Sequence, residues 1–207
     1  MNKVLVINAS ARKQRSLSRY MTNVFLETWL ENSPNDKVTY RDVGQDNIPH
    51  VSEAWIAAAF CPADQRTEEN REALKISDQL ISELQQADII VLGTPMYNWS
   101  IPSALKAYFD QVLRVNETVS LNKATPENLY NGLLKNKKVF VLMVRGNGGY
   151  SLGDFNEHLD FQTKYIETVF NIMGLEDIQQ VIVEGVDLGG NPIEEAARKV
   201  KELIVFQ

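Results

Sequence analysis

Hydrophobic residues in this chain form short continuous runs that are separated by longer stretches with helical spacing. Continuous runs predict strands that are covered on both faces, because a half-exposed strand alternates apolar and polar residues. We expect five strands, at Lys3–Ala9, Lys37–Val43, Asp88–Thr94, Lys137–Gly146 and Gln179–Gly185. The second of them alternates and is therefore expected to be the more exposed one.

Helical patterns lie between the predicted strands. Apolar residues recur three and four positions apart in 17–29, 67–86, 101–113, 166–173 and 193–204, and "TEEN" at 67–70 is typical of a helix cap. Strands that alternate with helices predict a parallel sheet with helices on both faces and right-handed crossovers. We therefore predict a single α/β domain over residues 1–207, a flavodoxin-like three-layer sandwich with a five-stranded parallel sheet.

Two connections between the predicted elements are longer than an α/β sandwich requires. They are Gln45–Arg66 and Val115–Asn136, whereas most connections in compact α/β units have about 2–6 residues. Long loops on a rigid scaffold often belong to a binding site or an interface. The alternative is that both are neutral surface insertions.

The composition of the chain argues against nucleic acids and membranes as partners. The net charge is −6 and Lys and Arg form no dense block, which argues against nucleic-acid binding. The apolar run at the N-terminus is too short for a signal peptide, and no stretch approaches the roughly 18 apolar residues of a membrane span. The single cysteine, Cys61, excludes an internal disulfide and fits a reducing compartment, so we expect a cytoplasmic protein with no membrane partner.

Metal or thiol chemistry has little support in the sequence. Only His50 and His158 are present, and they lie in different segments, so we expect no metal site. Cys61 follows "AAAF" and is expected to be a buried small apolar residue rather than a nucleophile.

The segment after the first predicted strand has the chemistry of a phosphate site. It lacks Gly-x-Gly-x-x-Gly and Gly-Lys-Ser/Thr motifs, but its predicted helix start offers free N–H groups and serine hydroxyls. The candidate residues are Ser10, Ser16, Leu17 and Ser18, with Arg12, Lys13 and Arg15 nearby to raise the local potential. Alternatively, Ser16 is only a helix cap.

The segments after the third and fourth predicted strands are suited to a flat ring. In "PMYNW", Tyr97 and Trp99 would pack on an aromatic ring and Asn98 would bond its edge, while Pro95 stiffens the turn and Met96 adds to the wall. In "VRGNGGY", the glycines allow a close approach of the backbone, and Arg145 would favour negative charge. The candidates here are Arg145, Gly146, Asn147 and Gly148. Taken separately, these segments are equally consistent with core aromatics and a mobile glycine turn.

All three segments follow strands of one predicted parallel sheet, so they should meet at its carboxyl edge. A phosphate seat, an aromatic wall and a glycine loop together fit a mononucleotide with a flat ring, such as FMN. On "KVLVINAS", "SLS", "ADIIVLGTPMYNWSIPSALKAYFDQVLR" and "VFNIMGLEDIQQVIVEG", the chain resembles the FMN-dependent NADH-azoreductases over nearly its whole length. These are flavodoxin-like NAD(P)H:quinone oxidoreductases.

The resemblance implies which residues hold the cofactor. Ser10 and Ser16–Ser18 would hold the phosphate, and Met96–Trp99 with Arg145–Gly148 would hold the isoalloxazine ring. Two features depart from the family. The glycine loop has one residue more than the usual Ser/Ala-Arg-Gly-Gly, and Val119 stands where the family has an aromatic residue over the flavin.

The resemblance also implies a reaction and an assembly. Two electrons would pass from NADH or NADPH through tightly bound FMN to quinones or azo compounds in a ping-pong cycle. The flavin N5 would carry the hydride, so that no side chain is catalytic. Asn98 would address the N5 side, and the N–H groups of Gly146–Gly148 would stabilise the reduced ring.

The family is typically a homodimer with two FMN sites at its interface, which would explain the two long connections. The sequence shows no basic pocket for a 2′-phosphate, which favours NADH. Two alternatives to this enzymatic function are a non-enzymatic flavodoxin-like electron carrier and an α/β domain that binds no flavin.

Overall fold

The fold is built on a parallel sheet of five strands. The computed structural model describes residues 1–122, 124 and 129–205. The strands are β1 (Lys3–Asn8), β2 (Lys37–Arg41), β3 (Ile89–Pro95), β6 (Lys138–Val144) and β7 (Asp177–Val183). They pair in the order β2-β1-β3-β6-β7, with β2 and β7 at the edges. The prediction of a flavodoxin-like five-stranded parallel sheet is confirmed.

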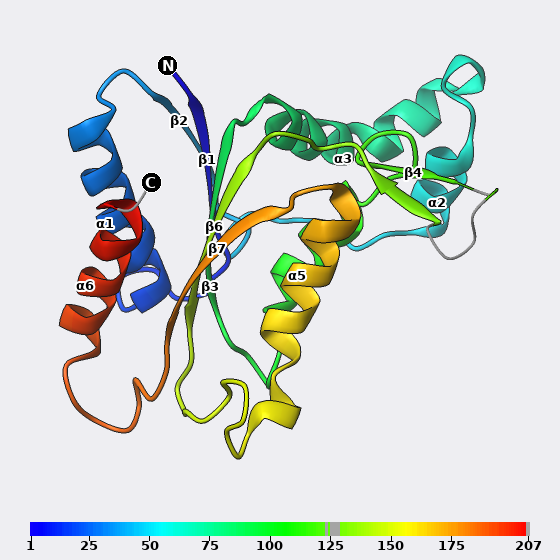
Figure 1. The fold of residues 1–207 in the computed structure, drawn as a ribbon. Coiled ribbons are helices and arrows are strands. Elements are labelled where there is room, and N and C mark those ends of the chain that lie inside the picture. The colour runs from blue at the N-terminus through cyan, green and yellow to red at the C-terminus, as the bar shows by residue number, and fades with distance from the viewer. Residues whose placement is uncertain (123, 125–128, 206–207) are drawn as a thin grey trace.

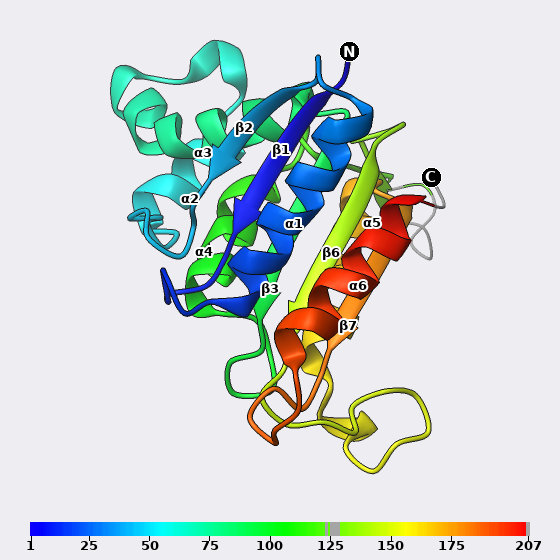
Figure 2. The ribbon, with the colours of Figure 1, turned by 90° about the vertical axis from the view of Figure 1, so that its left-hand side faces the viewer.

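Helices cover both faces of this sheet (Figure 1). One face carries α1 (Leu17–Asn32) and α6 (Pro192–Val205), which lie side by side in Figure 2. The other face carries α3 (Glu68–Gln86), α4 (Ser103–Val112) and α5 (Phe161–Met173). Because side chains alternate along a strand, Val4 and Val6 of β1 enter the core under α1 and α6, whereas Leu5 and Ile7 enter the opposite core.

Helix boundaries follow from local capping chemistry. Ser16 lies before α1, and its side chain accepts a hydrogen bond from the third helical N–H. Thr67 and Asn70 form a reciprocal capping box at the start of α3, as "TEEN" predicted. The end of α5 is set by Gly174, whose φ of 90° lies in the left-handed region.

The two long connections contain secondary structure that the sequence did not indicate. The first holds α2 (Glu53–Phe60) and a 3₁₀ turn at Ala63–Gln65, and Trp55 and Ala58 pack α2 on Leu74 of α3. The second holds an antiparallel pair, β4 (Val119–Leu121) and β5 (Tyr130–Gly132), while residues 123 and 125–128 lie outside the described part. Both segments project beyond the sheet on the side of α3 (Figure 1). They form what we call the projecting part, residues 45–66 and the described residues of 115–136.

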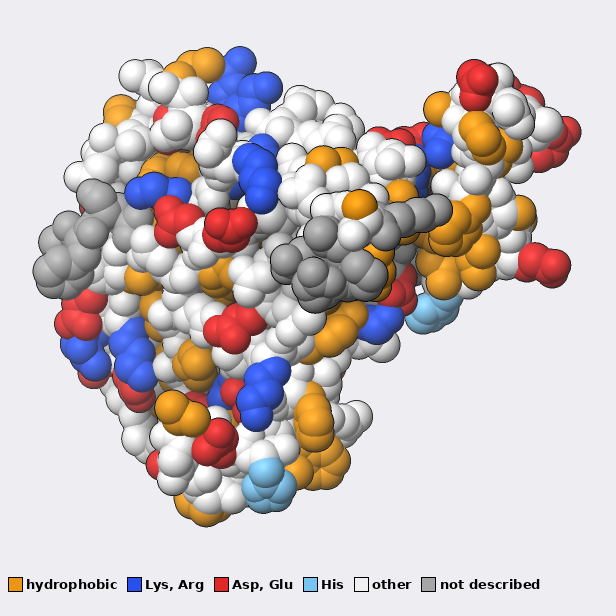
Figure 3. All heavy atoms as spheres, turned by 45° about the vertical axis from the view of Figure 1, so that its right-hand side comes forward, with side chains coloured by type: hydrophobic (Ala, Val, Ile, Leu, Met, Phe, Trp, Pro, Cys, Tyr) orange, Lys and Arg blue, Asp and Glu red, His pale blue; other side chains and the backbone are white. Residues whose placement is uncertain are grey.

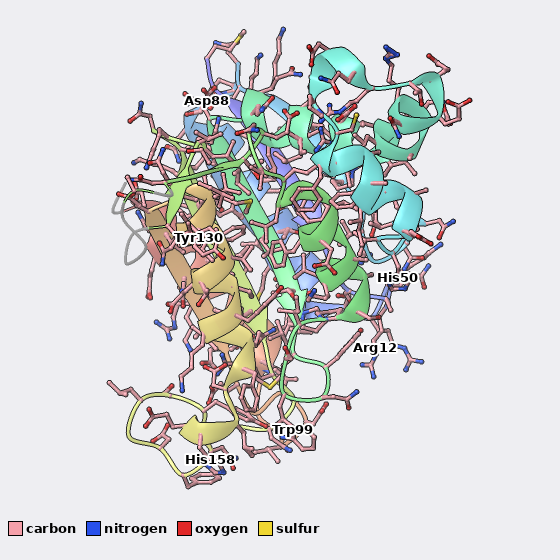
Figure 4. The ribbon with its side chains drawn as sticks, turned by 90° about the vertical axis from the view of Figure 1, so that its right-hand side faces the viewer. Arg12, His50, Asp88, Trp99, Tyr130 and His158 are labelled. Atoms are coloured by element: carbon pink, nitrogen blue, oxygen red, sulfur yellow. The ribbon has the colours of Figure 1, made fainter. Side chains whose placement is uncertain are left out.

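Cys61 and the histidines occupy separate places. Cys61 ends α2 and is only partly buried, so the expectation of a fully buried cysteine is wrong. His50 lies near the base of the projecting part, whereas His158 lies in a 3₁₀ turn at another end of the molecule (Figure 4). Among the described residues, no three His, Cys, Asp or Glu side chains are placed to share a metal ion. Nor is any described helix long and apolar enough to cross a membrane.

Candidate active site

A cavity of about 670 Å³ opens at the carboxyl edge of the sheet. Segments that follow β1, β3, β6 and β7 all contribute to its lining. Of the predicted residues, it is lined by Ser10, Ser16, Leu17, Ser18, Pro95, Met96, Tyr97 and Gly146. A smaller hollow of about 250 Å³ is lined by Asn98, Trp99 and Asn147 and shares Met96, Gly146 and Asp187 with the cavity.

The structure therefore brings all three predicted segments together. In Figure 4, Arg12 and Trp99 lie toward one end of the molecule and Asp88, which precedes β3, lies at the opposite end. Two of the predicted residues, Arg145 and Gly148, are outside the lining of both hollows. Contact of any of these residues with a cofactor stays a prediction.

Hydroxyl groups gather where α1 begins. The Ser16 Oγ accepts from the Arg19 N–H at 3.4 Å and lies 3.2 Å from the Ser18 Oγ. The Ser10 Oγ accepts from the Arg12 N–H at 3.2 Å. Ser16 is thus a helix cap, as the simpler interpretation held, and it also lines the cavity. The helix start and these hydroxyls form a seat of the kind that binds phosphate.

Three cationic side chains lie in the loop between β1 and α1, where they could affect the preference for NADH or NADPH. Arg12, Lys13 and Arg15 are exposed and make no ion pair within the described part of the chain. With Gln14 they surround a hollow of about 500 Å³ that shares Arg12, Gln14 and Arg15 with the main cavity. These cations form a basic surface beside the cavity, so the preference for NADH that we expected from the lack of such a surface is no longer supported.

Arg19 holds the loop between β1 and α1 in shape, a role that no sequence pattern indicated. Its guanidinium donates to the Ser10 carbonyl at 2.7 Å and to the Arg12 carbonyl at 2.8 Å. It also pairs with both oxygens of Asp42, just after β2, at 2.6 Å. The partners are up to 23 residues away in sequence, so no local pattern could have shown the pair. The bidentate pair ties the loop to the neighbouring strand end.

Two glycines allow the close packing that places this loop. A Cβ at Gly44 would lie 2.2 Å from the Ser10 carbonyl oxygen. A Cβ at Gly93 of β3 would lie 2.5 Å from the Thr22 Cγ2 and 2.9 Å from the Ser18 carbonyl oxygen. Both positions therefore exclude a side chain, and α1 begins directly against the sheet edge.

The aromatic segment forms a tight turn with an uncommon backbone. Asn98 and Trp99 have φ values of 47° and 64°, and the backbones of Tyr97 and Ser100 exchange two hydrogen bonds across them. Two successive positive φ values are typical of a type I′ turn. Trp99 remains 52% exposed, so it is not a core residue. Asn is a residue that tolerates this conformation, whereas Trp rarely adopts it.

Arg145 does not supply charge to the cavity, and that expectation is wrong. Its side chain is 1% exposed and turns inward. The guanidinium donates to Glu184 at 2.8 Å, Asp160 at 3.0 Å, Gln162 at 3.2 Å and Thr163 at 2.5 Å. These protein partners satisfy the charge, so it is not available to a bound anion.

The amides of the glycine loop fall into two groups. The N–H groups of Gly149 and Tyr150 donate to the Glu184 Oε2 at 2.9 and 3.4 Å. In the described part of the chain, no acceptor is bonded to the N–H groups of Gly146, Asn147 and Gly148. These three consecutive donors are therefore the amides of the loop that no acceptor of the described part occupies.

Known proteins match this chain over nearly its full length. A family described by the flavodoxin-like fold matches residues 2–204. The FMN-dependent NADH:quinone oxidoreductase of Nostoc punctiforme is 41% identical over 189 residues, covering 91% of this chain and 90% of that protein. The FMN-dependent NAD(P)H:quinone oxidoreductase 1 of Pseudomonas aeruginosa is 34% identical, covering 99% and 97%. The chain belongs to this family of flavodoxin-like quinone oxidoreductases.

Solved structures of the family agree with the fold. The FMN-dependent NADH-azoreductase of Bacillus anthracis, determined in complex with FMN, has a TM-score of 0.87 and 25% identity, covering 100% of this chain and 99% of that one. Another structure of azoreductase from the same species has a TM-score of 0.86 and 27% identity, covering 100% and 98%.

One of the four segments that line the cavity of this family member was not predicted from the sequence. Val186, Asp187, Pro192 and Ile193, between β7 and α6, line the cavity. The N–H groups of residues 185–187 donate to the carbonyls of residues 145–147 at 3.0–3.2 Å, so the two loops are tied together. The available signal was that "EGVDLGGNP" also follows a predicted strand and so lies at the same sheet edge.

Proposed function

We propose that this chain is an FMN-dependent oxidoreductase that passes two electrons from NADH or NADPH to quinones and azo compounds. The observation that carries the proposal is the cavity at the sheet edge with its adjoining smaller hollow. Together they combine the serines at the start of α1, the aromatic turn, and the loop residues Gly146 and Asn147, whose N–H groups have no acceptor in the described part of the chain. Membership of the family supports it, because relatives with this cofactor in their names cover nearly the whole chain.

The residues present fit FMN. A volume of about 670 Å³ is within the range of small-molecule sites. Ser10 and the start of α1 at Ser16–Ser18 would hold the phosphate, and the free cations of Arg12 and Arg15 would attract it. The turn at Met96–Trp99 would flank the ring. When bound, FMN supplies the two-electron chemistry.

The groups of the chain itself would bind FMN, orient its ring and stabilise its reduced form. The amides of Gly146–Gly148 would place hydrogen-bond donors against the polar edge of the ring, where reduction adds negative charge. Met96 and Gly146 line both hollows, so donor and acceptor would use one open site in turn, as a ping-pong cycle requires. No side-chain nucleophile is needed.

We also propose a homodimer in a reducing compartment such as the cytoplasm. Apolar side chains gather on the projecting part (Figure 3). Ile56 and Phe60 on α2 are 47% and 74% exposed, and Leu121 and Tyr130 of the hairpin are also exposed. An exposed apolar patch of this kind is typical of an interface.

The test is spectroscopic. We expect the purified protein to bind FMN, to lose the flavin colour when NADH is added without oxygen, and to regain it with a quinone. Steady-state data should give parallel double-reciprocal lines. Intersecting lines would contradict the shared site, whereas failure of NADH to bleach bound FMN would favour the electron carrier. Failure to take up FMN would favour a domain without flavin.

A further inference from the structure

The glycine loop rests on a cluster of two buried charges and one partly exposed charge, and this cluster lies outside the cavity and the smaller hollow. The cluster contains Arg145, Asp160 and Glu184. We infer that Glu184 is a positioning residue: joined to Arg145, it determines which amides of residues 146–150 remain free for the cofactor. This inference rests on the proposed function, because it concerns the same site.

The two oxygens of Glu184 have different tasks. Oε1 accepts from the Arg145 Nη1 at 2.8 Å, and Oε2 accepts from the N–H groups of Gly149 and Tyr150 at 2.9 and 3.4 Å. Glu184 directly follows β7, so its own backbone is held by the sheet. One carboxylate thus links a buried guanidinium to two neighbouring loop amides.

Arg145 gives this link a fixed anchor. It follows β6, and its guanidinium also bonds Asp160, Gln162 and Thr163 at the start of α5. The Asp160 Oδ1 accepts from the Thr163 N–H at 2.9 Å and caps α5. Two strand ends and one helix start therefore meet at one guanidinium that is 1% exposed.

The loop carbonyls are fixed as well. The Gly148 carbonyl accepts from the Asn156 Nδ2 at 3.0 Å, and the Gly149 carbonyl accepts from the Asn156 N–H at 2.8 Å. With these carbonyls and the amides of Gly149 and Tyr150 all bonded to protein, the loop has little freedom to turn. Its unpaired donors are then confined to residues 146–148, which is the preorganisation that electrostatic stabilisation needs.

The net charge of the cluster has an effect of its own, on the midpoint potential of bound FMN, that can be measured separately from the effect of its hydrogen bonds. Two carboxylates face one guanidinium, so the cluster contributes one net negative charge behind the loop. Removal of either carboxylate should ease reduction of bound FMN and raise its midpoint potential. Only Glu184, however, holds loop amides, so geometry and charge predict different results for the two residues.

The experiment compares Glu184→Gln with Asp160→Asn. A glutamine side chain has a single acceptor oxygen and cannot serve both Arg145 and the loop, whereas Asp160→Asn keeps the oxygen that caps α5. Glu184→Gln should raise the Kd for FMN about tenfold, as loss of a hydrogen bond to a charged group predicts. It should also speed amide exchange at Gly149 and Tyr150 in the FMN-free protein. Asp160→Asn should change that Kd less than about threefold, because it removes no hydrogen bond to the loop amides.

Two further variants complete the design. Glu184→Asp keeps the charge but shortens the side chain, so it should release the amides without raising the midpoint potential. Glu202→Gln, on the surface of α6 and paired with Arg198, removes a charge away from the loop and should leave affinity, exchange and potential unchanged.

Three results would overturn the inference. They are unchanged exchange and affinity in Glu184→Gln, an equal loss of affinity in Asp160→Asn, or full retention of affinity in Glu184→Asp. Failure of the wild-type protein to bind FMN would instead refute the proposed function. The exchange of Gly149 and Tyr150 in the FMN-free protein would still test the positioning role.

Discussion

Asn98 and Trp99 show how a single turn can hold an exposed aromatic side chain in place. Both residues have positive φ, yet neither is glycine. Such conformations cost about 1 kcal/mol or more for ordinary residues and persist when surrounding bonds fix them. Here the bonds between Tyr97 and Ser100, and that from the Phe161 N–H to the Trp99 carbonyl, fix the turn. The stored strain serves to project Trp99 outward beside the hollow.

Asn98→Val is expected to destabilise the turn, because a β-branched residue is poorly accommodated at positive φ. A cost of about 1–2 kcal/mol should lower the melting temperature by roughly 2–8 °C in a chain of this size. Asn98→Gly is the matched control, since glycine adopts the same φ without strain. It should keep the melting temperature while weakening FMN binding. Equal melting temperatures for the Asn98→Val variant and the wild-type protein, measured by calorimetry, would contradict the strain argument.

Which residues lie at the cavity was easier to predict from the sequence than the direction in which their side chains point. The place of Ser10 and the "PMYNW" block at the cavity could be predicted because they follow buried strands, and that of Ser16 and Ser18 because they lie at the start of the next helix. The inward turn of Arg145 could not, since it depends on Asp160 and Glu184, which are 15 and 39 residues away. The Arg19–Asp42 pair was hidden for the same reason.

At the scale of elements, the contact of α1 with β3 determines where the start of α1 lies at the edge of the cavity. Gly93 faces Thr22 and the Ser18 carbonyl too closely for any side chain. Gly93→Ala should push the first turns of α1 off the sheet and cost about 1–3 kcal/mol, as overpacking of a core does. We expect a lower melting temperature and a higher Kd for FMN, measured by fluorescence titration.

Gly148→Ala is the control for this substitution. A Cβ at Gly148 would have its nearest contact at 3.6 Å, which is ordinary packing, and its φ is not positive. The melting temperature should stay close to that of the wild-type protein. If Gly93→Ala were tolerated equally well, α1 would not be held by this contact.

Long periodic elements were predicted from sequence, and short ones were not. The strands and the helices α1, α3, α4, α5 and α6 follow from continuous apolar runs or helical spacing. The sequence of α2, "EAWIAAAF", is apolar on most sides and shows no amphipathic period. Strands β4 and β5 have three residues each, so their pairing depends on tertiary contacts rather than on a local pattern.

At the scale of the whole molecule, the projecting part is fastened to the helices on one face of the sheet. Gln111, in the last turn of α4, accepts from the Trp55 indole at 2.8 Å and donates to the Pro49 carbonyl at 2.8 Å. Its outer apolar side chains have no cover within the described part of the chain, in particular Ile56 and Phe60. A second copy of the chain, as in the proposed homodimer, would cover them.

If this part forms the proposed homodimer, Phe60→Asp should shift the protein from dimer to monomer, because a carboxylate at an apolar interface loses its hydration without gaining a partner. Light scattering coupled to size-exclusion chromatography measures the mass, and circular dichroism checks that the fold is kept. Tyr40→Asp is the control, since Tyr40 is also an exposed aromatic residue but lies on the edge strand β2, away from α2. It should leave the dimer intact. A wild-type protein that is monomeric at micromolar concentration, or a dimer that survives Phe60→Asp, would show that the projecting part serves another purpose.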